Sequence, residues 1–254
     1  MKSFIAFSKK EIFECVRTGK FTILGLLFLI FGIMNPAIAK LTPWMLGVLS
    51  NSLAGKIVTE VTVNALTSWT QFFKNIPITL IVFVFIYSGL FTKEYESGTL
   101  ILILTKGLSR YKVVLAKFFV MFTVWTIGYW SCFGITYGYN SYFWDNSIAI
   151  GLIPATIYWW IFGMWVICLV VLFSVLSKSH IGVLLGTGCS VFGVYLISLF
   201  PKIWRYTPTV LMEGSSLLIG TKTVEDYGIA LFITILVSIA CMLVSITLMN
   251  KKQL

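Results

Sequence analysis

The sequence predicts an all-α integral membrane protein with six transmembrane helices, and three observations lead to this prediction. The chain of 254 residues is 58% hydrophobic and only 11% charged, whereas soluble domains carry about 25% charged residues. Its mean hydropathy is +0.94. Six apolar stretches alternate with short polar segments, and most lysine and arginine residues fall in alternate segments. A chain this apolar must use lipid as the solvent for most of its surface.

Six stretches are long enough, or nearly so, to cross a hydrocarbon core about 30 Å thick as helices. They cover residues 21–39, 76–91, 113–137, 148–174, 181–200 and 227–249. The second stretch is marginal, so we expect it to include Phe72 and Phe73, with Lys74 reaching outward and Pro77 near the first helical turn. The stretches predict a six-span membrane domain at 21–249, after a segment at 1–20 and before a short tail at 250–254.

The positive residues predict the orientation of the chain. Six spans place both termini on one side of the membrane, and thirteen of the 19 lysine and arginine residues fall on that side. Positive residues are enriched in cytoplasmic loops. We therefore expect a multi-pass protein of the plasma membrane with cytoplasmic N and C termini. The net charge of +10 fits contact with anionic lipid headgroups. It does not indicate nucleic-acid binding, because no soluble basic domain is present.

The first twenty residues predict an amphipathic helix that lies along the inner leaflet. On a helical wheel Ile5, Ile12 and Val16 share one face, with Phe4 and Phe13 beside it. Lys10 and Arg17 lie opposite. A basic helix with one apolar face is typical of an interfacial helix.

Two segments on the outer side are long enough to form structure. Residues 40–75 contain a candidate interfacial helix around 44–58. Residues 201–226 contain the run Leu217-Leu218-Ile219, which is too short to cross the membrane and too apolar for a free loop. We therefore expect a re-entrant or interfacial segment before the sixth span. The aromatic residues at 137–144 fit a headgroup belt, and a substrate vestibule is the alternative.

The sequence lacks the residue patterns of several function classes. It has no HExxH or GxSxG motif, no cluster of metal ligands and no phosphate-binding loop. A membrane enzyme or an ion-coupled carrier would need ionisable residues at a common depth inside the spans, and we find essentially none. We therefore expect no catalytic residue, metal or cofactor on this chain. Energy for any uphill transport must come from another polypeptide.

One motif for helix packing stands at the start of the fifth span. Gly182 and Gly186 form a G-x-x-x-G motif, which lets two helices approach closely in lipid. The motif fits packing within the chain and fits a dimer interface equally well.

The connection between the second and third spans is rich in charge and also contains an apolar run. Glu94 and Glu96 precede the apolar residues 100–104, whereas Lys106, Arg110 and Lys112 follow them. Acidic residues favour the N-terminus of a helix and basic residues its C-terminus. Gly98 permits a tight bend before the run and Gly107 permits a stop after it. We expect a compact helical elbow, apolar in the middle and charged at both ends.

This connection resembles the cytoplasmic motif of ABC exporter permeases of type 2. The resemblance rests on Lys-Glu-Tyr-Glu-Ser-Gly-Thr-Leu at 93–100, on Gly-Leu-Ser-Arg at 107–110 and on Lys117. Many members of that family have proline where this chain has Gly107. The six-span layout, the amphipathic N-terminal helix and the long outer segment before the last span are also similar to that family.

The resemblance implies a working arrangement. The elbow would be a coupling helix seated in a groove of a cytosolic ATPase, and two permease chains, identical or homologous, would assemble with an ATPase dimer that binds ATP and magnesium. The resemblance assigns ATPase coupling to Glu94, Glu96, Gly98, Thr99, Leu100, Ser109 and Arg110.

The expected cargo is hydrophobic or amphipathic, such as a membrane-active antimicrobial peptide. Aromatic and methionine side chains without buried charges suit such a cargo better than an inorganic ion. A non-transporting immunity or sensor protein that binds a peptide without using ATP is the alternative function. That alternative predicts an elbow that tolerates mutation.

Overall fold

The computed structural model describes residues 2–52, 63–96, 98–105 and 107–252. Within these ranges every regular element is a helix, and six helices are long and apolar enough to cross a membrane. They are α2 (Lys20–Ser52), α3 (Ala65–Tyr87), α6 (Arg110–Phe143), α7 (Leu152–Leu176), α8 (His180–Ser198) and α11 (Gly228–Lys251). The predicted all-α fold with six spans is confirmed.

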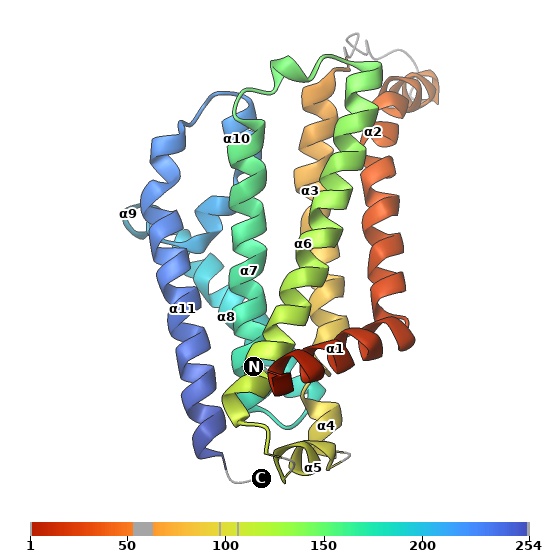
Figure 1. Cartoon of the computed structure of the whole chain (residues 1–254). Coiled ribbons are helices and arrows are strands. Elements are labelled where there is room, and N and C mark those ends of the chain that lie inside the picture. The colour runs from red at the N-terminus through yellow and green to blue at the C-terminus, as the bar shows by residue number, and fades with distance from the viewer. Residues whose placement is uncertain (1, 53–62, 97, 106, 253–254) are drawn as a thin grey trace.

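The long helices form one bundle, and both termini lie at the same end of it (Figure 1). α2 packs against α3 and α6, α6 packs against α7, and α7 packs against α8 and α11. α1 (Lys2–Arg17) lies across the bundle toward the end that holds the termini (Figure 1). The short helices α4 (Thr92–Glu96) and α5 (Thr99–Thr105) lie at that end too. We call it the elbow end, and the opposite end the far end.

The second span begins eleven residues earlier than predicted, at Ala65 instead of 76. Asn64 caps the helix, because its side chain accepts a hydrogen bond from the backbone N–H of Thr67 at 3.2 Å. Polar residues in the first turns of α3 lower the hydropathy of this region, so the apolar stretch begins later in the sequence than the helix does. Pro77 therefore lies in the interior of α3, where the absence of its N–H removes one hydrogen bond of the helix. Lys74 is exposed, as expected.

The first span also continues farther than predicted. α2 runs through residues 40–52, with Pro36 and Pro43 inside it. Trp44 and the residues after it therefore extend the spanning helix, and a separate interfacial helix beginning there is ruled out. The remainder of that predicted helix, 53–58, lies outside the described residues.

The connection between α6 and α7 differs from the prediction in a similar way. α6 continues to Phe143, and α7 begins at Leu152 instead of 148. Residues 146–148 form the 3-10 helix η1 (Asn146–Ile148), capped by the carboxylate of Asp145, which accepts from Ser147 N at 2.9 Å. Exposed tyrosines such as Tyr137 lie here, beside a surface hollow of about 600 Å³.

The middle of the bundle is filled by aromatic rings from α3 and α6. Phe83 meets Trp125 edge to face with ring centroids 5.6 Å apart, and Trp125 in turn contacts Tyr129 at 5.4 Å. α7 approaches this layer through Gly163, where an added Cβ would lie 2.2 Å from the Trp125 ring. α6 and α7 are therefore in close contact at this layer.

The segment before α11 packs into the bundle. It contains α9 (Pro201–Trp204), the 3-10 helix η2 (Pro208–Met212), α10 (Gly214–Leu218) and the 3-10 helix η3 (Val224–Tyr227). η2 contacts α7, α8 and α11, and α10 contacts α3 and α7. Leu217 and Leu218 are buried, and Ile219 is exposed. The Trp159 indole donates to Met212 O at 2.8 Å and fixes the segment from inside. The burial of Leu217 and Leu218 agrees with the expectation that this run is not a free loop.

Candidate functional site

The elbow, residues 92–109, consists of two short helices rather than the single helix predicted. α4 is separated from α5 by Gly98, whose φ of +65° is a conformation that favours glycine. Gly107 has φ +85° and ends the elbow before α6. Both glycines therefore occupy the turns for which the sequence suggested them.

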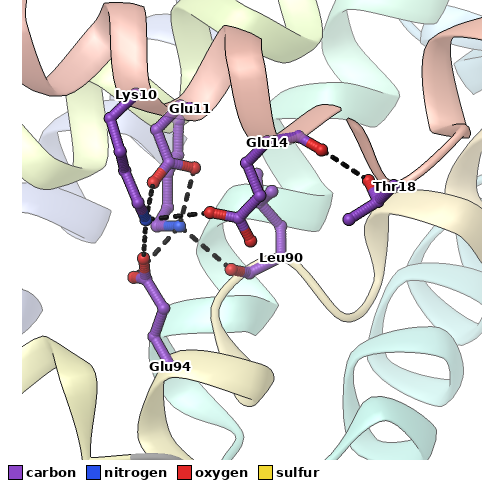
Figure 2. A network of polar contacts seen from close by, with 7 residues as sticks. Lys10, Glu11, Glu14, Thr18, Leu90 and Glu94 are labelled. Carbon is purple, nitrogen blue, oxygen red and sulfur yellow. Dashed lines mark hydrogen bonds and ion pairs between the residues drawn. The ribbon is translucent and has the colours of Figure 1, made fainter. Parts of the chain in front are cut away.

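Four charged side chains form a cluster between α1 and α4, and Figure 2 shows it from close by. We call Lys10, Glu11, Glu94 and Lys117 the charge cluster. Lys117 Nζ lies 3.0 Å from Glu11 Oε2 and 3.0 Å from Glu94 Oε2, and it donates to Leu90 O at 3.0 Å. The side chain of Lys117 is 1% exposed, that of Glu11 2% and that of Glu94 8%. Lys117 thus joins α1, α4 and α6 in the interior of the protein.

Lys10 makes a second bridge between the same two carboxylates. Its Nζ lies 2.9 Å from Glu11 Oε1 and 3.1 Å from Glu94 Oε1. It also lies 2.9 Å from Glu14 Oε2, one turn along α1. Each buried carboxylate is therefore shared by two lysines, one buried and one half-exposed.

The cluster is stabilising only because its charges are paired. Burial alone would raise the pKa of Glu11, but the charges of Lys117 and Lys10 and their hydrogen bonds outweigh burial and lower it. Burial alone would lower the pKa of Lys10, but Glu11, Glu14 and Glu94 raise it. Removing one partner of a buried ion pair costs about 3–5 kcal/mol, because the other charge stays buried without compensation. The cluster therefore resists separation of α4 from α1 and α6.

The structure places Glu94 differently from the sequence prediction. The prediction put the charge of Glu94 on a docking surface, but the side chain is buried in the charge cluster. Its position is explained by its partner Lys117, which lies within the third predicted span, residues 113–137. A lysine inside an apolar helix was the available signal, because such a residue needs an acidic partner.

The other elbow residues divide between the interior and the surface. Leu100 is buried, whereas Thr99 and Ile101 are exposed. A surface hollow of about 410 Å³ lies along α5 and the start of α6, and its lining includes Ile101 and Ser109. The side chain of Glu96 lies outside the described residues. The surface of α5 is thus the described part of the elbow that a partner could reach.

Arg110 lines this hollow too, but its guanidinium binds the end of α11. Its Nη1 donates to Met249 O and Asn250 O at 3.2 Å each, and to Lys252 O as well. These carbonyls belong to the C-terminal end of α11. The guanidinium therefore binds within the chain.

α1 has a buried face that the sequence did not predict. Ile5, Ile12 and Val16 are exposed, as expected of a face toward lipid. A second face, which carries Glu11 and Cys15, is buried against the bundle. The residues of this face recur every three to four positions in the sequence, but Glu11 gives the face a polar character that does not indicate burial.

The two glycines of the G-x-x-x-G motif make close contacts within the chain. A Cβ on Gly186 would lie 2.2 Å from the ring of Phe173 in α7. A Cβ on Gly182 would lie 2.1 Å from Ser177 Oγ, at the C-cap of α7. Both glycines thus serve the hairpin of α7 and α8 in this structure.

The described residues offer a mechanical linkage between the elbow and the bundle. They contain no group of three or more His, Cys, Asp or Glu side chains that could hold a metal ion. The charge cluster joins three elements through four shared ion pairs. Its arrangement can transmit displacement of the elbow to α1 and α6.

The chain matches a known protein family. The model of a family described as "ABC-2 family transporter protein" matches residues 5–213, more than half of the chain. The matched range contains most of α1, the elbow and the charge cluster. No curated protein matches the chain.

Proposed function

The chain belongs to the ABC-2 family of transporter proteins, and from this premise we propose that it is the permease subunit of an exporter driven by a separate cytosolic ATPase. Its described residues lack a metal-ligand group, and six of its helices can cross a membrane. Family membership implies association with an ABC ATPase and a dimeric arrangement. The ATP and magnesium would be bound by the ATPase.

The observation that carries this proposal is the burial of Lys117 between Glu11 and Glu94. An elbow that only connected two spans would not need a buried ion pair to hold it. With the cluster in place, a force applied to α5 reaches α4 through the short turn at Gly98. It then reaches α1 and α6 through Lys117. In this account α5 binds the ATPase, and Glu94 transmits the movement rather than touching the partner.

The pathway proposed for the cargo is the exposed face of α3 and α8. A groove of about 460 Å³ between these helices is lined almost wholly by apolar side chains, among them Val84, Phe162, Val191 and Phe192. α8 is the least buried of the six spanning helices. A second permease chain facing this groove would enclose an apolar space, which supports a hydrophobic or amphipathic peptide as cargo.

The first experiment is purification of the tagged chain from its native membrane under mild conditions, followed by identification of co-eluting proteins and an ATPase assay. An ABC ATPase should co-elute and hydrolyse ATP. A chain that elutes alone, even after mild crosslinking, would overturn the proposal. That result would favour a non-transporting protein that binds a peptide.

Two variants test the division of labour within the elbow. Ile101→Asp should remain in the membrane but lose the ATPase, because it places a charge on the exposed apolar surface of α5. Ile150→Asp is the matched control, because Ile150 is also exposed but lies at the far end.

Glu94→Gln should keep the ATPase and export less cargo per ATP. Loss of the ATPase in Glu94→Gln would show that Glu94 docks the partner after all.

A further inference from the structure

Arg110 stands at a position where its charge is unfavourable for its own helix. It is the first residue of α6, and the first turn of α6 contains no acidic residue to offset it. The N-terminus of a helix carries a partial positive charge, so a cation there is repelled. A residue that breaks a local rule in this way points to a compensating interaction elsewhere.

The compensating interaction is with the end of α11. The last four carbonyl groups of a helix have no partner within the helix. Arg110 donates to the carbonyls of Met249, Asn250 and Lys252, which surround the end of α11 at Lys251. A cation at this end also interacts favourably with the partial negative charge of the helix. Arg110 therefore satisfies carbonyl groups that α11 cannot satisfy itself.

Two more side chains tie the same end of α11 to its neighbours. Lys252 Nζ donates to Val175 O, in the last turn of α7, at 2.5 Å. The same ammonium lies 4.3 Å from the ring centroid of Tyr95 in α4, and the Tyr95 hydroxyl donates to the sulfur of Met249 at 3.6 Å. We call Tyr95, Arg110 and Lys252 the C-terminal clamp.

We propose that Arg110 is a positioning residue that couples the elbow to α11, an inference that rests on the proposed transport function. Glu94 and Tyr95 are neighbours on α4, and they face different partners. Glu94 joins α1 and α6, whereas Tyr95 meets the end of α11. α11 extends about 36 Å and contacts η2 and η3 at its other end. The clamp thus gives the elbow a second connection, through α11, to the segment before α11.

The test compares Arg110→Gln with Lys112→Gln. Lys112 lies in the same turn of α6. Its ammonium lies 5.8 Å from the ring centroid of Tyr111, in the same helix. The first measurement is hydrogen exchange of residues 245–252 in the purified chain. The second is cargo exported per ATP hydrolysed in the complex with its ATPase. Arg110→Lys keeps the charge and should restore part of both readouts.

The expected result for Arg110→Gln has three parts: faster exchange at the end of α11, retention of the ATPase, and an export-to-hydrolysis ratio reduced about tenfold, since the lost hydrogen bonds involve a charged group. Lys112→Gln should leave all three at the wild-type level. If Arg110→Gln does not fold, Arg110→Lys serves as the test variant: it keeps the charge but donates to fewer of the three carbonyls, so it should give a smaller change in the same direction.

Each other outcome overturns the inference in a different way. Unchanged exchange shows that Arg110 does not hold α11. Faster exchange with an unchanged export ratio leaves Arg110 a purely structural role. Loss of the ATPase makes Arg110 a docking residue. If the wild-type chain binds no ATPase, the proposed function fails and the coupling role fails with it, while the exchange data still decide whether the clamp exists.

Discussion

At the scale of single residues, Lys117 determines what the elbow can do. A lysine buried to 1% exposure inside a spanning helix is costly unless acidic partners surround it. Glu11 and Glu94 supply those partners from two elements far apart in sequence. The aromatic ring of Phe91 lies 5.3 Å from the ammonium and excludes water on another side. Four ion pairs thus fix a place where three helices meet.

Replacement of Lys117 by Met should lower the unfolding free energy by about 3–5 kcal/mol, because two carboxylates stay buried with only Lys10 beside them. The thermal midpoint of the detergent-solubilised chain measures this loss. Lys74→Met is the control, because Lys74 is exposed in α3. The triple variant Glu11→Gln, Glu94→Gln, Lys117→Met should recover much of the stability. An equal loss in the control would show that the cluster adds nothing specific.

The pH dependence of stability should follow Glu11. Its pKa is lower in the folded chain than the usual value of 4.5, so the unfolded chain binds its proton more readily. The stabilisation from Glu11 is therefore complete above about pH 4.5 and is lost as pH falls through the lower folded-state pKa. The thermal midpoint should drop below that pH in the wild type and drop less in Glu11→Gln. Identical profiles for the two proteins would contradict this assignment.

At the scale of elements, the sequence predicted most of the helices and missed features that depend on partners. Long apolar stretches identify α2, α7, α8 and α11 because lipid selects for continuous hydropathy. The start of α3 was missed because its polar residues lie against neighbouring helices instead of facing lipid: Ser68 is buried, and the half-buried Asn75 donates to Asn35 at 2.8 Å. The charge cluster could not be predicted because it joins residues up to 106 positions apart. The sequence shows only that Lys117 lies within an apolar stretch, and this indicates that it needs an acidic partner.

Close helix contact at Gly163 makes a further prediction at this scale. Gly163→Ala should destabilise the chain by about 1–3 kcal/mol, since the new methyl group would overlap the Trp125 ring. Gly134→Ala is the matched control, because an added Cβ there meets nothing within 4 Å. That control should be neutral or slightly stabilising, because alanine favours helix more than glycine does. The thermal midpoints of the two variants test the contrast, and equal midpoints would place the tight contact elsewhere.

At the scale of the whole molecule, the two ends of the bundle are held together by different polar contacts. The charge cluster and the C-terminal clamp both lie at the elbow end, where both termini also lie (Figure 1). Toward the far end, Glu213 accepts from the Trp204 indole at 3.0 Å and pairs with Lys222, which holds the segment before α11 together. α7 contacts both α6 and α11 and so links the two sides of the bundle.

The orientation of the bundle is testable with cysteine labels in a background without native cysteines. Ile101→Cys on the elbow and Ser147→Cys at the far end both place a thiol at an exposed site. Positive residues near the elbow end predict that it faces the cytoplasm. In intact cells an impermeant reagent should label Ser147→Cys, and it should reach Ile101→Cys only after permeabilisation. The reverse pattern would invert the topology.

The wide separation in sequence between Glu11 and its partner Lys117 has a consequence for biogenesis. Glu11 leaves the ribosome 106 residues before Lys117, a delay on the order of 5 to 20 s at usual rates of synthesis. During this interval the nascent chain holds two spans and a carboxylate whose buried partner has not yet been made. α1 therefore reaches its final place only after the third span has been inserted, and chains arrested earlier expose that carboxylate to cellular quality control.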